Sequence, residues 1–441
     1  MISSATPPSS ASRAAPAQPP LQGFKLANGL QVYLREDHRA PLVSAQLWYH
    51  VGSSYEPVGQ SGLSHLLEHL MFEGSAKLAP GQYTKLITLL GGEPNAFTSE
   101  DATCFPVTLP VSRLEIVLEA MADAMGTARF EQSTFEREVQ VVLAERRVQT
   151  DQRPLAIALE RDRLQAHAGS PYATPIIGHQ ADVEGLTAQA ARDWYLHWYQ
   201  PDNATLVVVG DIDLQRLRQY VERHFSAAAR EQAPAQPHPA VPSAWQSRSQ
   251  TVALPQMREG LLMSFNVPSQ ATAADEQESC ALRLIPELMM NGVSSRLYRQ
   301  LINRRPLIQA MRSEYRHVLR GDSLMSFFMF SNPQQGTPQQ AGEVVWDELQ
   351  VLTQTAPSEA ELKRAKARLL ANLVFARDMI SKQADAIGRY AAIGVDPAFL
   401  DREQQAIEQV SADAVRQAAL AYLTRDRLSI TYMLPEEHSH D

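Results

Sequence analysis

The chain has 441 residues, with 40 Lys plus Arg against 49 Asp plus Glu, and a formal net charge of −9. This mildly anionic balance argues against a nucleic-acid-binding protein or a polybasic membrane-surface protein. No apolar run approaches the roughly 18 residues that a membrane-spanning helix needs, so we expect a soluble chain without membrane insertion. Cys104 and Cys280 are too few for a disulfide framework or a thiolate zinc cluster and are expected to be free, buried thiols.

The N-terminal segment is composed largely of Ala, Ser and Pro and lacks the apolar core of a signal peptide. Such a segment buries too little apolar surface to fold, so we predict a disordered tail over residues 1–20. A tail of this kind is also what often remains after a signal peptide has been removed. On the tail alone, the bacterial periplasm is favoured over the cytoplasm, and the compartment stays open.

The predicted elements begin with strands. An Asn-Gly pair at residues 28–29 separates two short alternating apolar runs, which predicts a β-hairpin. Residues 42–51 alternate in the same way and predict a third strand. From residue 62 to 72 the apolar side chains recur at helical spacing, which predicts an amphipathic helix. A further helix is predicted over residues 133–150, beginning at a capping box in which Ser133 is followed by Glu136.

The middle of the chain is rich in Pro and polar residues. Residues 231–246 are therefore predicted to be a linker between two domains, 21–230 and 247–437. We expect an α+β fold in which each domain is an α/β layer structure, with a mainly antiparallel sheet and helices packed on one face.

The two predicted domains resemble each other. Residues 186–192 match 410–416 at an offset of 224 (186 + 224 = 410), and in both copies a helix leads to a strand. Residues 70–74 match 288–292 at an offset of 218 (70 + 218 = 288). Either match alone could arise by chance between α/β segments. Two matches in the same order with similar offsets favour an internal duplication.

The chemistry-bearing motif lies on the helix predicted at 62–72. His65, Glu68 and His69 are spaced three and four residues apart and so share one face of that helix. Two imidazoles at this spacing can reach one zinc ion, which binds imidazole nitrogen at about 2.0–2.1 Å. A bound zinc lowers the pKa of its water to about 7, and Glu68 beside it could take that proton and return it to a leaving amine.

The same residues could instead belong to an ordinary solvent-facing helix, because the motif lacks a third ligand. Zinc hydrolases commonly use two His and one Glu. The helix predicted at 133–150 supplies candidates in Glu136, Glu138 and Glu145, and residue type alone selects none of them.

The His-x-x-Glu-His string resembles the signature of the pitrilysin/insulinase family of inverted-motif zinc peptidases. In that family the third ligand follows the second His by about 76 residues, and here 69 + 76 = 145 is a glutamate. The resemblance implies one Zn²⁺ per chain, bound by His65, His69 and Glu145, with Glu68 as the catalytic base and later acid. A second family glutamate lies seven residues before the ligand, which gives Glu138 a role in supporting the ligands or orienting substrate.

A second segment strengthens the resemblance. Residues 91–98 read Gly-Gly-Glu-Pro-Asn-Ala-Phe-Thr and are similar to a family edge strand that pairs with the substrate backbone. The resemblance assigns substrate contacts to Asn95, Ala96 and Phe97, and to Phe72 after the zinc helix. Edge-strand pairing gives affinity with loose sequence preference. Without the resemblance, Asn95 would be an ordinary turn residue.

Two departures from the family pattern lie in the second half. At the offset of 218, the zinc motif corresponds to Arg283, Pro286 and Glu287, so no second metal site is expected. Complete family members also carry an Arg and, seven residues later, a Tyr that polarise the scissile carbonyl. Counting from a Ser-Ser-Arg-Leu stretch at 294–297 places Ile302 and Gln309 there, and neither can do this. In a shifted register, Arg304, Arg305 or Tyr315 could substitute.

From these departures and the half-size length we hypothesise a heterodimer. Each chain would be half of a clamshell, and a related zinc-free subunit, similar to a mitochondrial-processing-peptidase partner, would supply the Arg/Tyr pair. A homodimer is possible in isolation. The predicted function is a zinc-dependent endopeptidase that cleaves peptides or unfolded oligopeptides in a closed chamber.

Two other functions remain open. A non-catalytic, core-protein-like structural subunit can have the same fold, although such relatives usually lose the metal ligands. A zinc-containing module could also capture peptides and release them uncut. The sequence gives neither the cleavage specificity nor the physiological substrate.

Overall fold

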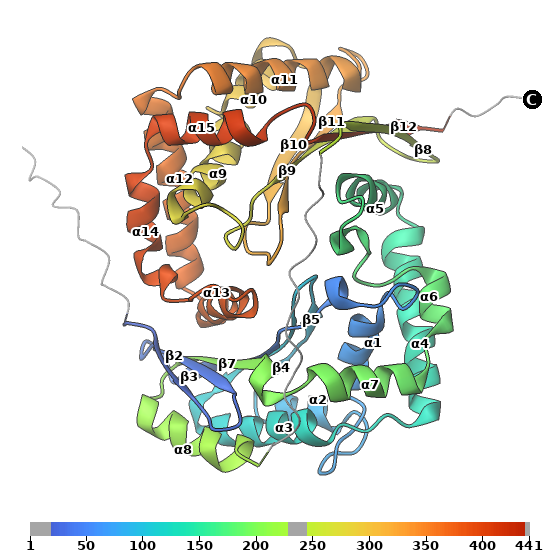
Figure 1. Cartoon of the computed structure of the whole chain (residues 1–441), viewed down its shortest axis with the longest axis vertical. Helices are drawn as coiled ribbons and strands as arrows, with labels where there is room; N and C mark the ends of the chain where they lie inside the picture. Colours follow the sequence, from blue (N-terminus) through green and yellow to red (C-terminus); the bar gives the residue numbers. More distant parts are fainter. Residues whose placement is uncertain (1–18, 228–244, 437–441) are drawn as a thin grey trace, which may run out of the picture.

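The computed structural model describes residues 19–227 and 245–436 (Figure 1), which we call the first half and the second half. Residues 1–18 of the predicted tail and residues 231–244 of the predicted linker lie outside the described residues. The domain limits that the sequence suggests therefore stay a prediction.

The first half is built on a seven-stranded sheet. The predicted hairpin is confirmed, because β1 and β2 pair antiparallel around Gly29, which has a left-handed φ of 97°. The predicted strand and zinc-motif helix are also confirmed, as β3 and α1. The elements are β1 (Gln22–Lys25), β2 (Gln31–Glu36), β3 (Leu42–Tyr49), α1 (Leu63–Leu70), α2 (Gln82–Leu89), β4 (Glu93–Pro94), β5 (Phe97–Thr98), β6 (Thr103–Pro110), α3 (Leu114–Thr127), α4 (Gln132–Arg146), α5 (Pro154–Ala166), α6 (Gln180–Gly185), α7 (Ala188–Trp198), β7 (Ala204–Gly210) and α8 (Leu214–Phe225).

The second half is built on a five-stranded sheet. Its elements are β8 (Arg248–Leu254), β9 (Gly260–Val267), α9 (Glu276–Met289), α10 (Arg296–Tyr298), β10 (Ile308–Tyr315), β11 (Ser323–Ser331), α11 (Pro338–Gln354), α12 (Glu359–Arg377), α13 (Ile380–Ala392), α14 (Phe399–Gln409), α15 (Ala412–Tyr422) and β12 (Leu428–Pro435).

The topology confirms the internal duplication. The strand order β2-β7-β3-β6 of the first sheet recurs as β8-β12-β9-β11 in the second. The first pair in each order is parallel and the following pairs are antiparallel. β9 begins 218 residues after β3 (42 + 218 = 260), and β12 begins 224 residues after β7 (204 + 224 = 428). These are the offsets found in the sequence, so both matches reflect equivalent elements.

One helix of each half packs on the sheet of the other half. Within its own half, each sheet carries helices on one face, as predicted. The opposite face of the second sheet is covered by α5 of the first half, and that of the first sheet by α13 of the second half (Figure 1). Gln46 on β3 donates to the carbonyl of Ser381 on the α13 side at 3.0 Å. Asp162 on α5 accepts from Ser264 and Thr431 of the second sheet, each at 2.7 Å. The halves are therefore interlocked through these two helices.

The apolar core crosses the junction between the halves. One cluster lies inside the first half, between its sheet and helices. A second cluster joins Trp48, Cys104 and Val207 of the first sheet to the apolar residues of the second half. Both cysteines are free and buried, as expected. Among the described residues, no helix combines the length and apolar character needed to cross a bilayer.

One prediction about helix α4 is wrong. The helix begins at Gln132 with Glu131 as N-cap, and no side chain caps it. The helix already includes Gln132, so Ser133 lies inside the first turn and cannot be the N-cap, and the Glu136 side chain accepts from that of Gln132 at 2.8 Å. At its other end the α-helix stops at Arg146 and continues as a π-helical segment to residue 151.

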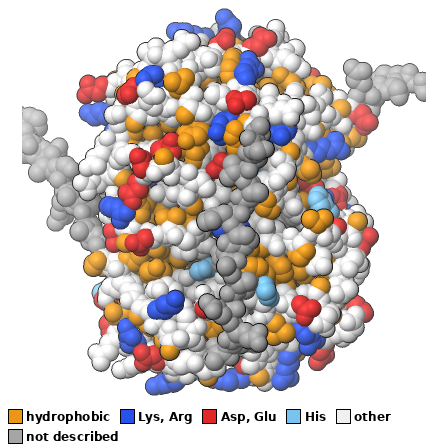
Figure 2. Space-filling view, viewed as in Figure 1, with side chains coloured by type: hydrophobic (Ala, Val, Ile, Leu, Met, Phe, Trp, Pro, Cys, Tyr) orange, Lys and Arg blue, Asp and Glu red, His pale blue; other side chains and the backbone are white. Residues whose placement is uncertain are grey.

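The surface carries charges of both signs. On the face shown in Figure 2, acidic and basic side chains are interspersed over both halves, and hydrophobic side chains lie among the charged ones. This face therefore presents no extended field of a single sign.

Candidate zinc-peptidase site

The N-terminus and the apolar face of helix α1, which carries the zinc motif, are fixed by contacts with the rest of the first half. The Glu56 carboxylate accepts from the backbone N–H groups of Gly62 at 2.8 Å and Ser64 at 2.7 Å, which satisfies two unpaired donors at the helix N-terminus. Gly62 has a left-handed φ of 88°, and a Cβ there would lie 2.7 Å from the carbonyl oxygen of Ile177. The apolar stripe of the helix is buried in the first-half core, with Leu63, Leu66, Leu67 and Leu70. The motif side chains therefore start from a fixed backbone.

Three donor atoms from two helices converge on one point. His65 Nε2 lies 3.9 Å, and His69 Nε2 3.6 Å, from Oε2 of Glu145 on α4. The donor atoms of the three residues lie within 4.8 Å of one another. Tetrahedral zinc with bonds of about 2.0–2.1 Å has ligand atoms about 3.4 Å apart. The donor set of two imidazoles and one carboxylate thus fits a zinc ion to within a few tenths of an ångström for the two measured pairs.

A second carboxylate orients one imidazole. Glu138, two helical turns before Glu145 on α4, lies 3.3 Å from Nδ1 of His69 through its Oε2. A proton on Nδ1 that is held by this carboxylate leaves the lone pair on Nε2, which faces Glu145. The supporting role that the resemblance implied for Glu138 stays a prediction, and this contact is compatible with it.

The electrostatics of the three residues suit metal binding. Burial lowers the pKa of His65 to about 4, and the neighbouring His69 acts in the same direction, so His65 is neutral at pH 7. Burial also opposes the charged form of His69, but Glu145, Glu68 and Glu138 outweigh it and raise the pKa of His69. The contact with His69 lowers the pKa of Glu145 and keeps it ionised.

Glu68 lies beside the three donors and has one defined partner. Glu68 is 8 % exposed, and this burial raises the pKa of its carboxyl group. Thr98 Oγ1 on β5 donates to Glu68 Oε2 at 2.5 Å, which fixes the carboxylate next to the two imidazoles. A buried carboxylate with a raised pKa is suited to accept and return a proton near neutral pH. Thr98 ends the 91–98 segment that resembles the family edge strand, and the resemblance assigned it no role.

A cavity of about 470 Å³ opens in front of the motif. Two of the four residues predicted to contact substrate, Ala96 and Phe97, line it together with His65, Glu68 and Glu145. Its other walls come from β5, the π-helical segment after α4, α5 and the loop before α6. They combine apolar side chains (Ala156, Leu159, Pro175, Ile176 and Ile177) with polar ones (Thr98, Gln149, Thr150, Glu160 and Arg163).

The other two predicted substrate residues lie elsewhere. Asn95 is exposed between β4 and β5, and its side-chain oxygen accepts from the N–H of Ala96 at 2.9 Å. Phe72 packs in the first-half core, with its ring 5.6 Å from Tyr83 and 5.7 Å from Phe105. The edge-strand prediction agrees with the sheet, because β4 and β5 pair only with β6 among the described strands.

The second half replaces the metal motif with ion pairs. Arg283 donates to Glu403 at 2.7 Å in a buried pair, Pro286 lies inside α9, and Glu287 pairs with Arg368 at 3.2 Å. Among the described residues, His65, His69 and Glu145 form the only group of three that could hold a metal ion.

The positions expected to bear the Arg/Tyr pair lie away from the cavity. Ile302 packs half-buried against the second-half core, and exposed Gln309 accepts from Arg258 at 3.1 Å. The alternative Tyr315 donates to the carbonyl of Pro268 at 2.6 Å. Arg304 and Arg305 are exposed, and neither lines the cavity.

Comparison with known families supplies the class of enzyme. Residues 31–178 match the family described as "Insulinase (Peptidase family M16)", and residues 185–369 match the one described as "Peptidase M16 inactive domain". The chain belongs to the M16 family. It is an M16 zinc peptidase in which the matched catalytic region carries the His65, His69 and Glu145 group.

Individual M16 relatives match over nearly the whole chain. Zinc protease PqqE of Helicobacter pylori is 28 % identical over 404 residues, which cover 91 % of this chain and 90 % of that protein. The crystal structure of a protease from Helicobacter pylori has a TM-score of 0.87 at 26 % identity and covers 95 % of this chain and 100 % of its own.

A third M16 relative is a piece of a longer protein. The structure of the first half of the periplasmic protease PqqL from Escherichia coli covers 95 % of this chain and 93 % of its own. It has a TM-score of 0.75 at 20 % identity, which shows a shared fold. The fold of this chain thus matches about one half of the longer PqqL chain.

Proposed function

We propose that this M16 chain is a zinc-dependent endopeptidase that cleaves peptides or unfolded oligopeptides in a chamber. The observation that carries the proposal is the convergence of His65, His69 and Glu145 beside the buried carboxylate of Glu68. The three donors match the His₂Glu set of zinc hydrolases, which leaves a fourth position open.

The residues divide the chemistry between them. His65, His69 and Glu145 would hold the ion, and Glu138 would orient His69. Zinc bound there would supply a Lewis acid that activates water and polarises a carbonyl. Glu68 accepts the proton of the attacking water and then donates it to the leaving amine, while Thr98 holds the carboxylate in place.

We propose that the substrate lies along β5 as an added strand. Ala96 and Phe97 line the cavity and lie at the edge of the first sheet, and Asn95 precedes them. Main-chain pairing to an edge strand binds extended segments of many sequences, whereas a folded protein offers few such segments. Phe72 would act only indirectly, because it follows α1 and its ring packs in the first-half core against Tyr83 and Phe105.

We further propose that a second, related chain closes the chamber and supplies the missing Arg/Tyr pair. Ile302 and Gln309 provide no such pair, and a relative of twice this size contains a matching first half. Mixing the purified chain with a related zinc-free chain should raise peptide hydrolysis at least about tenfold, since a preorganised donor to a developing oxyanion is worth this much or more. Unchanged activity would favour a homodimer or an active single chain. The bacterial periplasm is the proposed compartment, by likeness to PqqL.

The test of the central proposal combines metal content with hydrolysis of an unstructured peptide. Wild type should contain one zinc per chain and cleave the peptide at internal bonds. Glu68→Gln should keep the zinc and lose turnover by at least about a hundredfold, whereas Glu136→Gln, on the exposed side of α4, should behave as wild type. A chain that binds zinc and peptide without cleavage would be a capture module, and one without zinc would be a structural subunit.

A further inference from the structure

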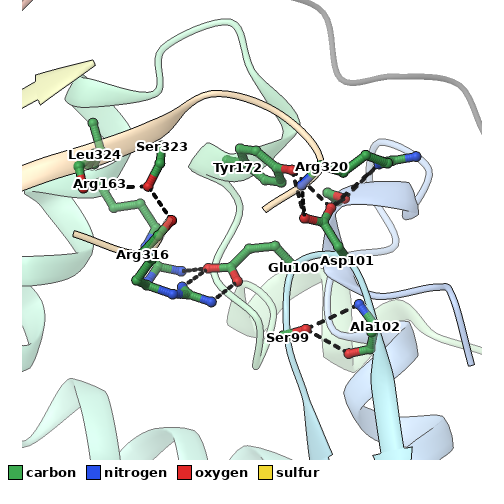
Figure 3. A network of polar contacts seen from close by, with 11 residues as sticks. Ser99, Glu100, Asp101, Ala102, Arg163, Tyr172, Arg316, Arg320, Ser323 and Leu324 are labelled. Carbon is green, nitrogen blue, oxygen red and sulfur yellow. Dashed lines mark hydrogen bonds and ion pairs between the residues drawn. The ribbon is translucent and has the colours of Figure 1, made fainter. Parts of the chain in front are cut away.

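A buried polar network joins the two halves at the turn that follows β5 (Figure 3). It is centred on Ser99–Ala102, which connects β5 to β6 and which we call the 99–102 turn. Two adjacent carboxylates of this turn, Glu100 and Asp101, are each only 3 % exposed. Burial of a carboxylate is costly unless it is paired and hydrogen-bonded. The partners of these two side chains therefore determine whether the turn can keep this conformation.

Glu100 is paired mainly by the second half. Nη1 and Nη2 of Arg316 each donate to one of its carboxylate oxygens at 2.5 Å, and Arg163 on α5 adds a contact at 3.1 Å (Figure 3). The bidentate arrangement fixes the orientation of the carboxylate as well as its charge. Burial alone would raise the pKa of Glu100, but the two arginines outweigh it and hold the pKa at about 2.

Asp101 is held by both halves. Its carboxylate accepts from the Tyr172 hydroxyl at 2.8 Å, from Ser54 Oγ at 3.1 Å and from the backbone N–H of Arg320 at 2.9 Å. The N–H of Gly321 in turn donates to the Tyr172 hydroxyl at 2.8 Å. The segment from residue 316 to 321 of the second half thus contacts both carboxylates of the turn, directly and through Tyr172.

The turn also contacts the catalytic elements. Thr98, the residue before it, donates to Glu68 at 2.5 Å. On its other side, the carbonyls of Ser99 and Glu100 accept from the N–H groups of Ser53 at 3.1 Å and Ser54 at 2.9 Å, in the segment that leads to the cap of α1. A displacement of the turn would therefore move the partner of the general base.

We propose that Arg316 is a positioning residue for peptide hydrolysis, which acts from the second half by holding the 99–102 turn and thereby Thr98 against Glu68. This inference rests on the proposed peptidase function. The second half, which lacks the metal motif, would then affect the rate of peptide hydrolysis in addition to forming a wall of the chamber. Arg163 contacts the same carboxylate through a single longer bond, so its contribution is the smaller one.

The kinetic test uses zinc-loaded full-length chain and an unstructured peptide. Arg316→Gln should lower kcat about tenfold with KM and zinc content unchanged, because small misplacements of a catalytic group cost this much or more. Arg316→Lys should restore part of the loss, and Arg312→Gln should have no effect, since Arg312 lies over the ring of Phe328 within the second half. In a Thr98→Val background, Arg316→Gln should cause less than about a twofold further loss. Full kcat in Arg316→Gln, or losses that multiply in the double variant, would overturn the proposal.

The second readout is backbone amide hydrogen exchange of the metal-free chain. Arg316→Gln should speed exchange at the N–H groups of Ser53, Ser54 and Arg320 by about tenfold, and Arg312→Gln should leave it unchanged. Unchanged exchange in Arg316→Gln would show that the arginine does not hold the turn and would overturn the proposal. Faster exchange with undiminished kcat would overturn it as well. A wild-type chain without peptidase activity would count against the proposed function, while the exchange experiment would still report on the turn.

Discussion

The packing of α13 on the first sheet predicts a large effect from adding one methyl group. Gly388 lies in α13 directly against Trp48 on β3, and a Cβ at this position would lie 2.1 Å from Nε1 and 2.2 Å from Cε2 of the indole. Trp48 is fully buried, so the ring has no free space to move into. Overpacking of this kind typically costs about 1–3 kcal/mol, at the upper end here, whereas Ala in place of Gly gains roughly 0.5–1 kcal/mol in a helix. Gly388→Ala should therefore lower the free energy of unfolding by about 2 kcal/mol.

The assay is urea denaturation followed by Trp fluorescence and circular dichroism. The matched control is Gly126→Ala in α3, where a Cβ would meet no atom within 4 Å and where we expect a gain of about 0.5–1 kcal/mol. If Gly388→Ala were as stable as wild type, the two halves would not be interlocked through α13 as described. The Gly388→Ala variant could also unfold in two steps in urea, with the contact between the halves lost first. This result would still agree with the description, because the added methyl group strains that contact.

Three further predictions concern the site, the inter-half network and the second half. Glu138→Ala should weaken zinc binding by about 10–100-fold in chelator competition, because His69 loses the partner that orients it, while Glu136→Ala should not; equal affinities would remove Glu138 from the site. The pKa of Glu100 lies at about 2 against an ordinary 4.5, so its stabilising contribution is complete above about pH 4.5 and is lost as the pH falls toward 2. Glu100→Gln should flatten this part of the pH–stability curve in thermal melts, and a curve parallel to that of wild type would contradict the pairing. Arg283→Met should cost about 3–5 kcal/mol by leaving Glu403 buried and unpaired, and adding Glu403→Leu should recover most of it without changing zinc content; an unrecovered loss would refute this explanation.

Local patterns in the sequence were sufficient to locate the elements that carry the site. The helical spacing of leucines around His65 predicted α1, and alternation predicted the strands, because both patterns report which face of an element is buried. The choice of Glu145 over Glu136 and Glu138 required the family resemblance, since all three are plausible charges on one helix. The structure brings Glu145 to both imidazoles, Glu138 to the back of His69, and leaves Glu136 on the exposed side.

Contacts between distant parts of the chain could not be predicted in this way. The sequence of α5 gives no sign that this helix covers the sheet of the other half. The pair between Glu100 and Arg316 joins positions 216 residues apart, and charged residues are too common for such a pair to be recognised by pattern. The capping box at Ser133 was predicted wrongly because the pattern alone does not fix where the helix begins. The helix begins at Gln132, which places Ser133 inside it, and Glu136 accepts from the Gln132 side chain.

The most direct test of the account is the zinc content of the chain, measured together with X-ray absorption at the zinc edge. The account predicts one zinc per chain, bound by nitrogen and oxygen donors that include two imidazoles, and loss of the ion in both His69→Ala and Glu145→Ala. A chain that retained stoichiometric zinc after Glu145→Ala, or whose zinc had sulfur ligands, would contradict the convergence of α1 and α4 on one ion.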